Sequence, residues 1–252
     1  MTQADVRQGQ PRWSSQDRMD DGPRRALRPH RPRRPDDVRR DRRAPRPTPQ
    51  TACCPPTLAV LRRAVSEATP VVRAAIESAL NELEHAGARI VDARDIHGID
   101  QHLSAFMFTI IGEASLGFEA LLRDSADGIS PKIRANLQLG TELRAADYLR
   151  AQRYRTMLRE SVNGALEGAD AIVTPTMQRE PWTWKELDEL EELVIFGYTA
   201  PFSLTGNPAL SIPVPSLGLP VGLQLVGRQG QDERLFDLGE WMENTVTGVT
   251  LR

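Results

Sequence analysis

The sequence is poor in the residue types that build redox, metal and nucleotide sites. Its two cysteines, Cys53 and Cys54, are adjacent, which fits neither a C-x-x-C motif nor an ordinary disulfide pair. Among its four histidines, His97 and His102 are five residues apart, a spacing that matches no metal-binding helix motif. The glycine-rich phosphate loops G-x-x-x-x-G-K-[ST] and G-x-G-x-x-G do not occur. We therefore expect no metal and no cofactor.

Long apolar runs are also missing. The first residues contain no continuous apolar segment of the kind that forms a signal peptide. No run approaches the roughly twenty apolar residues that a membrane-spanning helix needs. We therefore expect a soluble cytoplasmic protein that does not bind membranes.

Lysine is scarce, whereas arginine is abundant and unevenly distributed. The chain has only Lys132 and Lys185, and fourteen of its arginines lie in residues 1–50 with seven aspartates. Within residues 22–49 the aliphatic content beyond alanine is too low to bury a core that offsets the entropy of ordering. We predict that residues 1–56 form a disordered tail and that residues 57–252 form the folded part.

Three interpretations of this tail stay open. Clustered arginines suit an electrostatic arm for nucleic acid, but the interleaved aspartates weaken the positive field, so we do not expect nucleic acid as a partner. A plain solvated tail is the second interpretation. The third is a frameshifted or misplaced start, because arginine without lysine is expected of a GC-rich gene and wrong-frame translation of such DNA is rich in Arg and Pro.

Residues from Thr69 onward alternate between helix-like and strand-like patterns. Thr69 and Pro70 begin a helix with one apolar face, which Gly87 ends before a short buried strand at Ile90 and Val91. The same patterns predict helices over 100–123, 131–167, 185–196 and 231–246, a strand over 171–173, and a hairpin of strands 209–214 and 221–226. Alternating helices and strands indicate an α/β layered fold.

Two sequence features look like catalytic or cation sites without fitting them. Glu113 to Gly117 is the nearest match to G-x-S-x-G, but its first glycine is missing and it lies in a helical pattern, so we interpret Ser115 as structural. The acidic run over residues 185–192 surrounds apolar positions of an amphipathic helix, which is typical of a solvated face.

Three stretches in the second half match the motifs of a known family. They are DAIVTPT, YTAPFSLTGNPALSIPVP and GLPVGLQLVGRQGQDERLF. They resemble the C-terminal half of the amidase signature family, which includes amidases and the A subunits of glutamyl-tRNA amidotransferases. The resemblance covers roughly residues 65–246. It implies an incomplete α/β/α layered fold with a mixed sheet, and hydrolysis of amide carbon–nitrogen bonds in a small-molecule substrate.

The resemblance stops before the catalytic residues of the family. There, a serine attacks the amide, a second serine in a cis peptide relays the proton, and a neutral lysine is the base. The Gly-Gly-Ser-Ser-Gly-Gly type of loop and its lysine belong before residue 65, and neither is present. Ser14 and Ser15 have no glycines around them, and Lys132 and Lys185 lie in later helices. We therefore assign no catalytic residue and expect the chain alone to be inactive.

The resemblance places three residues near the acyl pocket of the family. These are Tyr198, Thr199 and Phe202, which we predict to contact substrate, with ordinary packing between a helix and the hairpin as the alternative. The leading function is thus that of an amidase-family protein that lacks its Ser-Ser-Lys core. The alternative is a truncated, non-catalytic module that binds a partner through exposed apolar surface, and a homo-oligomer is compatible with either.

Overall fold

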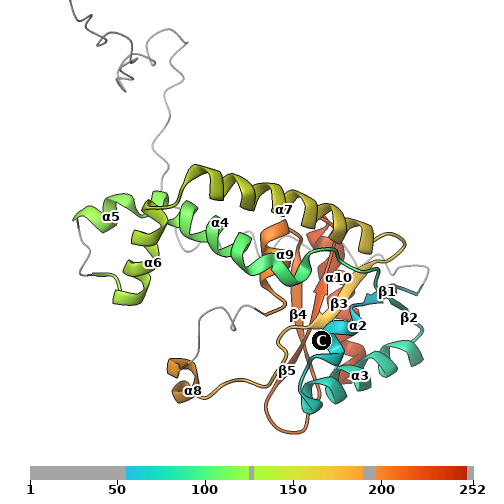
Figure 1. Ribbon diagram of the computed structural model, residues 1–252. Helices are drawn as coiled ribbons and strands as arrows, with labels where there is room; N and C mark the ends of the chain where they lie inside the picture. Colours follow the sequence, from blue (N-terminus) through green and yellow to red (C-terminus); the bar gives the residue numbers. More distant parts are fainter. Residues whose placement is uncertain (1–54, 125–127, 190–196, 249–252) are drawn as a thin grey trace, which may run out of the picture. The chain divides into compact units, whose positions relative to one another are not determined.

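A mixed sheet of five strands forms the centre of the computed structural model, which describes residues 55–124, 128–189 and 197–248 (Figure 1). The strand order is β2-β1-β3-β5-β4. Strands β1 and β2 are parallel, as are β1 and β3, whereas β5 runs antiparallel to both β3 and β4. The strands are β1 (Thr57–Val60), β2 (Arg89–Asp92), β3 (Ala171–Pro175), β4 (Ala209–Val214) and β5 (Val221–Val226).

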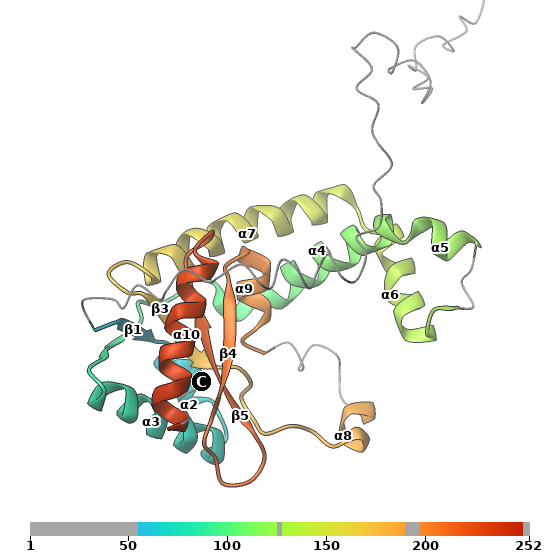
Figure 2. The same cartoon turned by 180° about the vertical axis from the view of Figure 1, so that it is seen from behind.

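Helices cover both faces of this sheet. Helices α3 (Pro70–His85) and α10 (Asp232–Thr247) pack on one face, where Leu58 and Val60 join their core. Helices α4 (His102–Gly117), α7 (Ala145–Ala165) and α9 (Ala200–Thr205) pack on the other, against Ala59 and Ile172 (Figure 2). Alternate residues of β1 and β3 therefore enter different cores, as the two-residue period of a strand requires. The predicted α/β/α layered fold with a mixed sheet is confirmed.

Most of the predicted elements are present. Helix α3 begins at Pro70 after Thr69, and its buried side chains follow the apolar face seen in the sequence. The hairpin is formed by β4 and β5, which pair from Ala209 opposite Val226 to Val214 opposite Val221. Helix α10 buries Leu235 and Met242. The prediction of a tail over residues 1–56 falls almost entirely outside the described residues.

The sequence patterns gave no prediction for the residues of β1, and they predicted that the strand corresponding to β2 is buried. Strand β1 has only four residues and passes through Leu61 directly into α2 (Arg62–Ser66), so no turn signal separates the two elements. Strand β2 lies at the end of the sheet, and Ile90 and Val91 are half-buried because only one neighbouring strand covers them. The expectation of a buried strand there was therefore wrong.

The two longest predicted helices are each divided. The first is split into a 3-10 turn (Ile99–Gln101), α4 and α5 (Glu119–Asp124), and the second into α6 (Pro131–Thr141) and α7. The buried residues of α7 are Ala151, Leu158, Val162 and Ala165, whereas Leu149 is 57% exposed. Helix α8 (Trp184–Glu189) begins near its predicted start, and the rest of that predicted helix lies outside the described residues. In the described part of the chain, no helix combines the length and apolarity that spanning a bilayer demands.

Gly140 explains how α6 lies against α4. A Cβ atom at this position would stand 2.2 Å from the carbonyl oxygen of Ile111 and 2.8 Å from the side chain of Ser115. Neither the backbone oxygen nor the buried serine can move away cheaply. The two helices therefore approach closely only because residue 140 has no side chain.

Replacing Gly140 tests this close approach. We expect Gly140→Ala to lower the free energy of unfolding by about 1 to 3 kcal/mol, because an overpacked contact must be relieved by moving a helix. Gly164→Ala in α7 is the matched control, since its Cβ would meet no atom within 4 Å, and removing a helical glycine should stabilise the chain by up to about 1 kcal/mol. Urea denaturation of both variants measures the difference, and equal effects of the two substitutions would contradict the packing described.

Candidate functional site

Residues 197–199, which directly precede α9, lie at the edge of the sheet where the parallel strands end. Tyr198 contacts Glu67, which follows α2 after β1, and the backbone nitrogen of Thr69 donates to the carbonyl of Gln178, which follows β3, at 2.7 Å. In α/β sheets, ligands bind outside the carboxyl ends of parallel strands. Two of the three predicted substrate contacts, Tyr198 and Thr199, are half-buried at this edge.

Tyr198 is held in a row of hydrogen-bonded polar side chains. Its hydroxyl donates to Glu67 Oε2 at 2.6 Å. Arg63 donates from Nε to Glu67 Oε1 at 2.7 Å and from Nη1 to Asp100 Oδ2 at 2.6 Å. We call Tyr198, Glu67, Arg63 and Asp100 the Tyr198 network. It joins the segment before α9 to α2 and to the turn before α4.

The network shifts the pKa values of Tyr198 and Glu67. Burial, and then the hydrogen bond to the Glu67 carboxylate, raise the pKa of Tyr198 to about 12. The hydrogen bonds from Tyr198 and Arg63 lower the pKa of Glu67. Near neutral pH the tyrosine is therefore a neutral donor beside an ionised carboxylate.

A buried amide fixes the backbone of Tyr198 to the sheet. Gln224 on β5 is 3% exposed, and its Nε2 donates to the Tyr198 carbonyl at 3.0 Å and to Thr174 Oγ1 at 2.9 Å. Thr174 on β3 is fully buried and donates in turn to the Pro175 carbonyl at 3.0 Å. Each buried polar group thereby gains a partner, which avoids the cost of leaving it unpaired. Gln224 on β5, which is itself held by Thr174 on β3, thus fixes the position of the Tyr198 backbone.

The Gly206-Asn207-Pro208 break anchors the other end of α9. Gly206 has a φ of +77°, and the backbone nitrogens of Gly206 and Asn207 both donate to the Phe202 carbonyl, at 3.0 and 3.1 Å. This is the helix-ending geometry that glycine favours. The buried Asn207 side chain accepts from Thr205 Oγ1 at 2.7 Å and donates to the Gly227 carbonyl at 2.8 Å. The break therefore ties α9 to the residue that follows β5.

Phe202 occupies a different environment from the other two predicted contacts. Its ring is 0% exposed and belongs to the core formed with α4 and α7. This location matches the alternative of packing that the sequence left open, although substrate contact by any of the three residues stays a prediction. Thr199 precedes the first residue of α9 and is half-buried.

His102 was not identified from the sequence as part of this region. It begins α4, is 8% exposed, and its Nδ1 donates to the Ile99 carbonyl. Burial is the main cause that lowers its pKa, so the imidazole is neutral at pH 7. Its only sequence signal was a histidine at the start of an apolar helix. Among the residues described, no group of three or more His, Cys, Asp or Glu side chains is placed to hold a metal ion.

Comparison with known proteins identifies the family to which this fold and segment correspond. The family model named Amidase matches residues 28–236, more than half of the chain. The chain belongs to the amidase family. The matched range begins at residue 28, inside the segment predicted to be a tail.

Curated amidase-family relatives are matched over only part of their length. The A subunit of glutamyl-tRNA(Gln) amidotransferase from Thermosynechococcus vestitus is 31% identical over 204 residues, which are 70% of this chain and 42% of the relative. Its counterpart from Myxococcus xanthus is 33% identical over 202 residues, 69% of this chain and 41% of the relative. The chain thus spans less than half of these relatives.

Solved structures of the family agree with this coverage. A crystal structure of an amidase is 27% identical with a TM-score of 0.65, over 77% of this chain and 46% of that one. The A subunit of glutamyl-tRNA(Gln) amidotransferase from Thermotoga maritima is 26% identical with a TM-score of 0.56, over 76% and 42%. The fold alone is shared with a 6-aminohexanoate cyclic dimer hydrolase, at 19% identity and a TM-score of 0.67.

The Tyr198 network is tested by replacing its tyrosine. In Tyr198→Phe, Glu67 loses the donor that lowers its pKa most, so its pKa should rise toward the ordinary value of 4.5. A titration of the side-chain carboxyl resonances by NMR measures this shift. Tyr148→Phe is the control, because the Tyr148 hydroxyl donates to Glu113, and it should leave Glu67 unchanged.

The same network predicts a loss of stability in alkali. Tyr198 holds its proton more tightly in the folded chain, with a pKa of about 12 against an ordinary 10.0. Its contribution to the free energy of unfolding is complete below pH 10 and is lost as the pH rises toward 12. The Tyr198→Phe variant should lack this part of the alkaline loss. An unchanged Glu67 pKa together with an unchanged alkaline profile would contradict the network.

Proposed function

We propose that residues 57–252 form the C-terminal part of an amidase domain, and that they serve amide hydrolysis only when a segment with the two serines and the lysine of the family completes the site. The observation that carries this proposal is the family match over residues 28–236, combined with coverage of less than half of the relatives. The 252 residues contain no Gly-Ser-Ser-Gly loop.

The chemistry of the described serines and lysines supports inactivity of the chain alone. A serine hydroxyl attacks an amide only when a positioned base takes its proton. Ser115, the one serine in a sequence like a hydrolase motif, donates to the Gly112 carbonyl of its own helix at 2.9 Å. Lys132 and Lys185 are exposed on α6 and α8. The Ser115 hydroxyl is thus engaged within α4, and neither lysine precedes a serine-rich loop of the kind that the family uses.

The part that this chain contributes is a wall for the substrate. Tyr198 is held at the carboxyl edge of the sheet by Gln224 and by the Tyr198 network, and Thr199 follows it in the chain. Phe202 packs in the core and keeps α9 in place. In the proposed complete site, Tyr198 and Thr199 contact the acyl side of a small-molecule amide, and Phe202 supports them.

A binding role without catalysis is the second candidate. It is favoured by large apolar side chains that are exposed along α4, α5 and α6, among them Ile110, Phe118 and Ile133. Exposed apolar surface that is concentrated in one region marks binding sites more often than isolated exposed residues do.

An ammonia-release assay tests the proposed function. We expect the purified chain to release no more ammonia from propionamide or benzamide than a buffer blank does, while a complete amidase in the same assay turns over. Turnover that a serine-directed reagent abolishes would contradict the proposal. In that event, the double variant Ser14→Ala and Ser15→Ala shows whether the only adjacent serine pair in the chain is responsible.

A further inference from the structure

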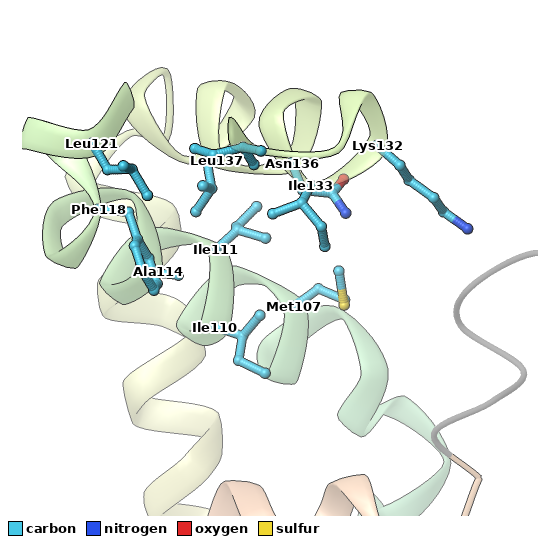
Figure 3. A pocket seen from close by; sticks show the side chains of 11 residues that line it. Met107, Ile110, Ile111, Ala114, Phe118, Leu121, Lys132, Ile133, Asn136 and Leu137 are labelled. Atoms are coloured by element: carbon cyan, nitrogen blue, oxygen red, sulfur yellow. The ribbon is translucent and has the colours of Figure 1, made fainter. Parts of the chain in front are cut away.

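The described residues offer an apolar pocket and, separately, a polar surface on the sheet. The pocket between α4, α5 and α6 has a volume of about 410 Å³ and is lined almost entirely by apolar side chains (Figure 3). Its two polar lining residues, Lys132 and Asn136, each already have an interaction partner, so the pocket does not specify a polar ligand. The sheet beside Tyr198 instead presents a pair of hydroxyl groups that the proposed wall does not use.

The side chains of Thr176 and Ser211 meet above a glycine of the sheet. Thr176 follows β3, Ser211 lies on β4, and β5 runs between these two strands. Their hydroxyl oxygens are 2.6 Å apart. A Cβ atom at Gly222 on β5 would stand 2.6 Å from Ser211 Oγ and 2.7 Å from Thr176 Oγ1. The two hydroxyls therefore meet above β5 only because residue 222 has no side chain. We call Thr176 and Ser211 the hydroxyl pair.

The strand register places the hydroxyl pair next to Tyr198. Ser211 lies directly opposite Gln224, and directly opposite residues share one face of a sheet. Gln224 is the residue whose Nε2 donates to the Tyr198 carbonyl at 3.0 Å. Ser211 is exposed and Thr176 is half-buried. The hydroxyl pair is therefore accessible to a ligand that lies against the proposed wall.

The hydroxyl pair can both donate and accept hydrogen bonds. One hydroxyl hydrogen forms the bond between the two oxygens, which leaves the other hydrogen free to donate and lone pairs on both oxygens free to accept. Neither group carries a charge near neutral pH. The matching ligand group is uncharged and has a carbonyl that accepts beside an N–H that donates. A primary carboxamide has this pattern, whereas a carboxylate and a tertiary amide both lack the N–H.

We infer that the hydroxyl pair binds the carboxamide group of a primary amide. The amide carbonyl accepts from the free hydroxyl hydrogen, and the amide N–H donates to a hydroxyl oxygen of the pair. The rest of the ligand lies against Tyr198 and Thr199. The inference rests on the proposed function, because it names the class of amide that the wall receives, but binding at the hydroxyl pair requires no hydrolysis.

Three related benzoyl compounds test this chemistry. The full chain is titrated with benzamide, N,N-dimethylbenzamide and benzoate while its backbone amide resonances are followed by NMR. The dissociation constant of benzamide should be on the order of millimolar, as expected of so small a ligand, and Ser211 and Gly222 should show saturable shifts. Benzamide should bind about fivefold more tightly than either analogue, which is the effect of one hydrogen bond. Equal affinities, or saturable shifts on α4 and α6 alone, would overturn the inference, as would the absence of any saturable shift.

Matched variants locate the site. The double variant Thr176→Val and Ser211→Ala removes both hydroxyls with little change in size, and it should abolish the preference for benzamide over N,N-dimethylbenzamide. Thr141→Val is the control and should retain the preference, because the exposed Thr141 hydroxyl donates to the Gln138 carbonyl of its own helix α6. Gly222→Ala should also abolish the preference, because the added Cβ displaces both hydroxyls without removing either. Circular dichroism verifies that each variant is folded, and the double variant decides the outcome if Gly222→Ala does not fold.

The same measurements separate this inference from a purely structural role and from the proposed function. If the hydroxyl pair only ties β4 to the end of β3, the double variant lowers the midpoint of urea denaturation and leaves the preference for benzamide unchanged. That result would overturn the inference and leave the proposed function intact. Ammonia release that a serine-directed reagent abolishes would instead overturn the proposed function, whereas the preference for benzamide reports binding alone.

Discussion

The pairing of β1 between β2 and β3 is the interaction on which the rest of the described structure depends. Leu58 and Val60 are completely buried in one core, and Ala59 enters the other. The start of the strand is fixed at Thr57, whose backbone nitrogen and oxygen each bond to Asp170 at 2.8 Å. Its end is fixed by the Leu61 nitrogen, which donates to the Val173 carbonyl at 3.0 Å. This short strand thus joins the helix layers and places α2 at the carboxyl edge.

The candidate site follows from this placement. Because α2 starts directly after β1, Glu67 reaches Tyr198, and because β5 pairs with β3, Gln224 reaches both Thr174 and the Tyr198 backbone. The segment before α9 is therefore held from two directions, by a charged network that faces solvent and by a buried amide. The site is positioned by the sheet, and the sequence contains no Gly-Gly-Ser-Ser-Gly-Gly type of loop.

Local patterns predicted those elements that have a regular apolar pattern and a clear end signal. Helix α3, strand β3, the hairpin and α10 belong to this class, and the break at Gly206 was visible as a glycine before Asn-Pro. Strand β1 was missed because it has only four residues and no turn signal separates it from α2. The division between α6 and α7 falls just after Gly140, where α6 makes a contact with α4 that no local pattern reveals. Tyr198 and Phe202 are close in sequence, yet only three-dimensional packing distinguishes a half-buried hydroxyl from a core ring.

The central claim is that the described residues from Thr57 onward form a folded part of the amidase family that is organised around β1. Native-state hydrogen exchange tests it most directly, because amides in the most stable part of a protein exchange only on global unfolding. We predict that the amides of Leu61 and Ala93, which bond to β3 and β1 respectively, exchange with the free energy that urea denaturation gives for the whole chain. Exchange of these two amides within the dead time, while amides of α7 remain protected, would contradict the account.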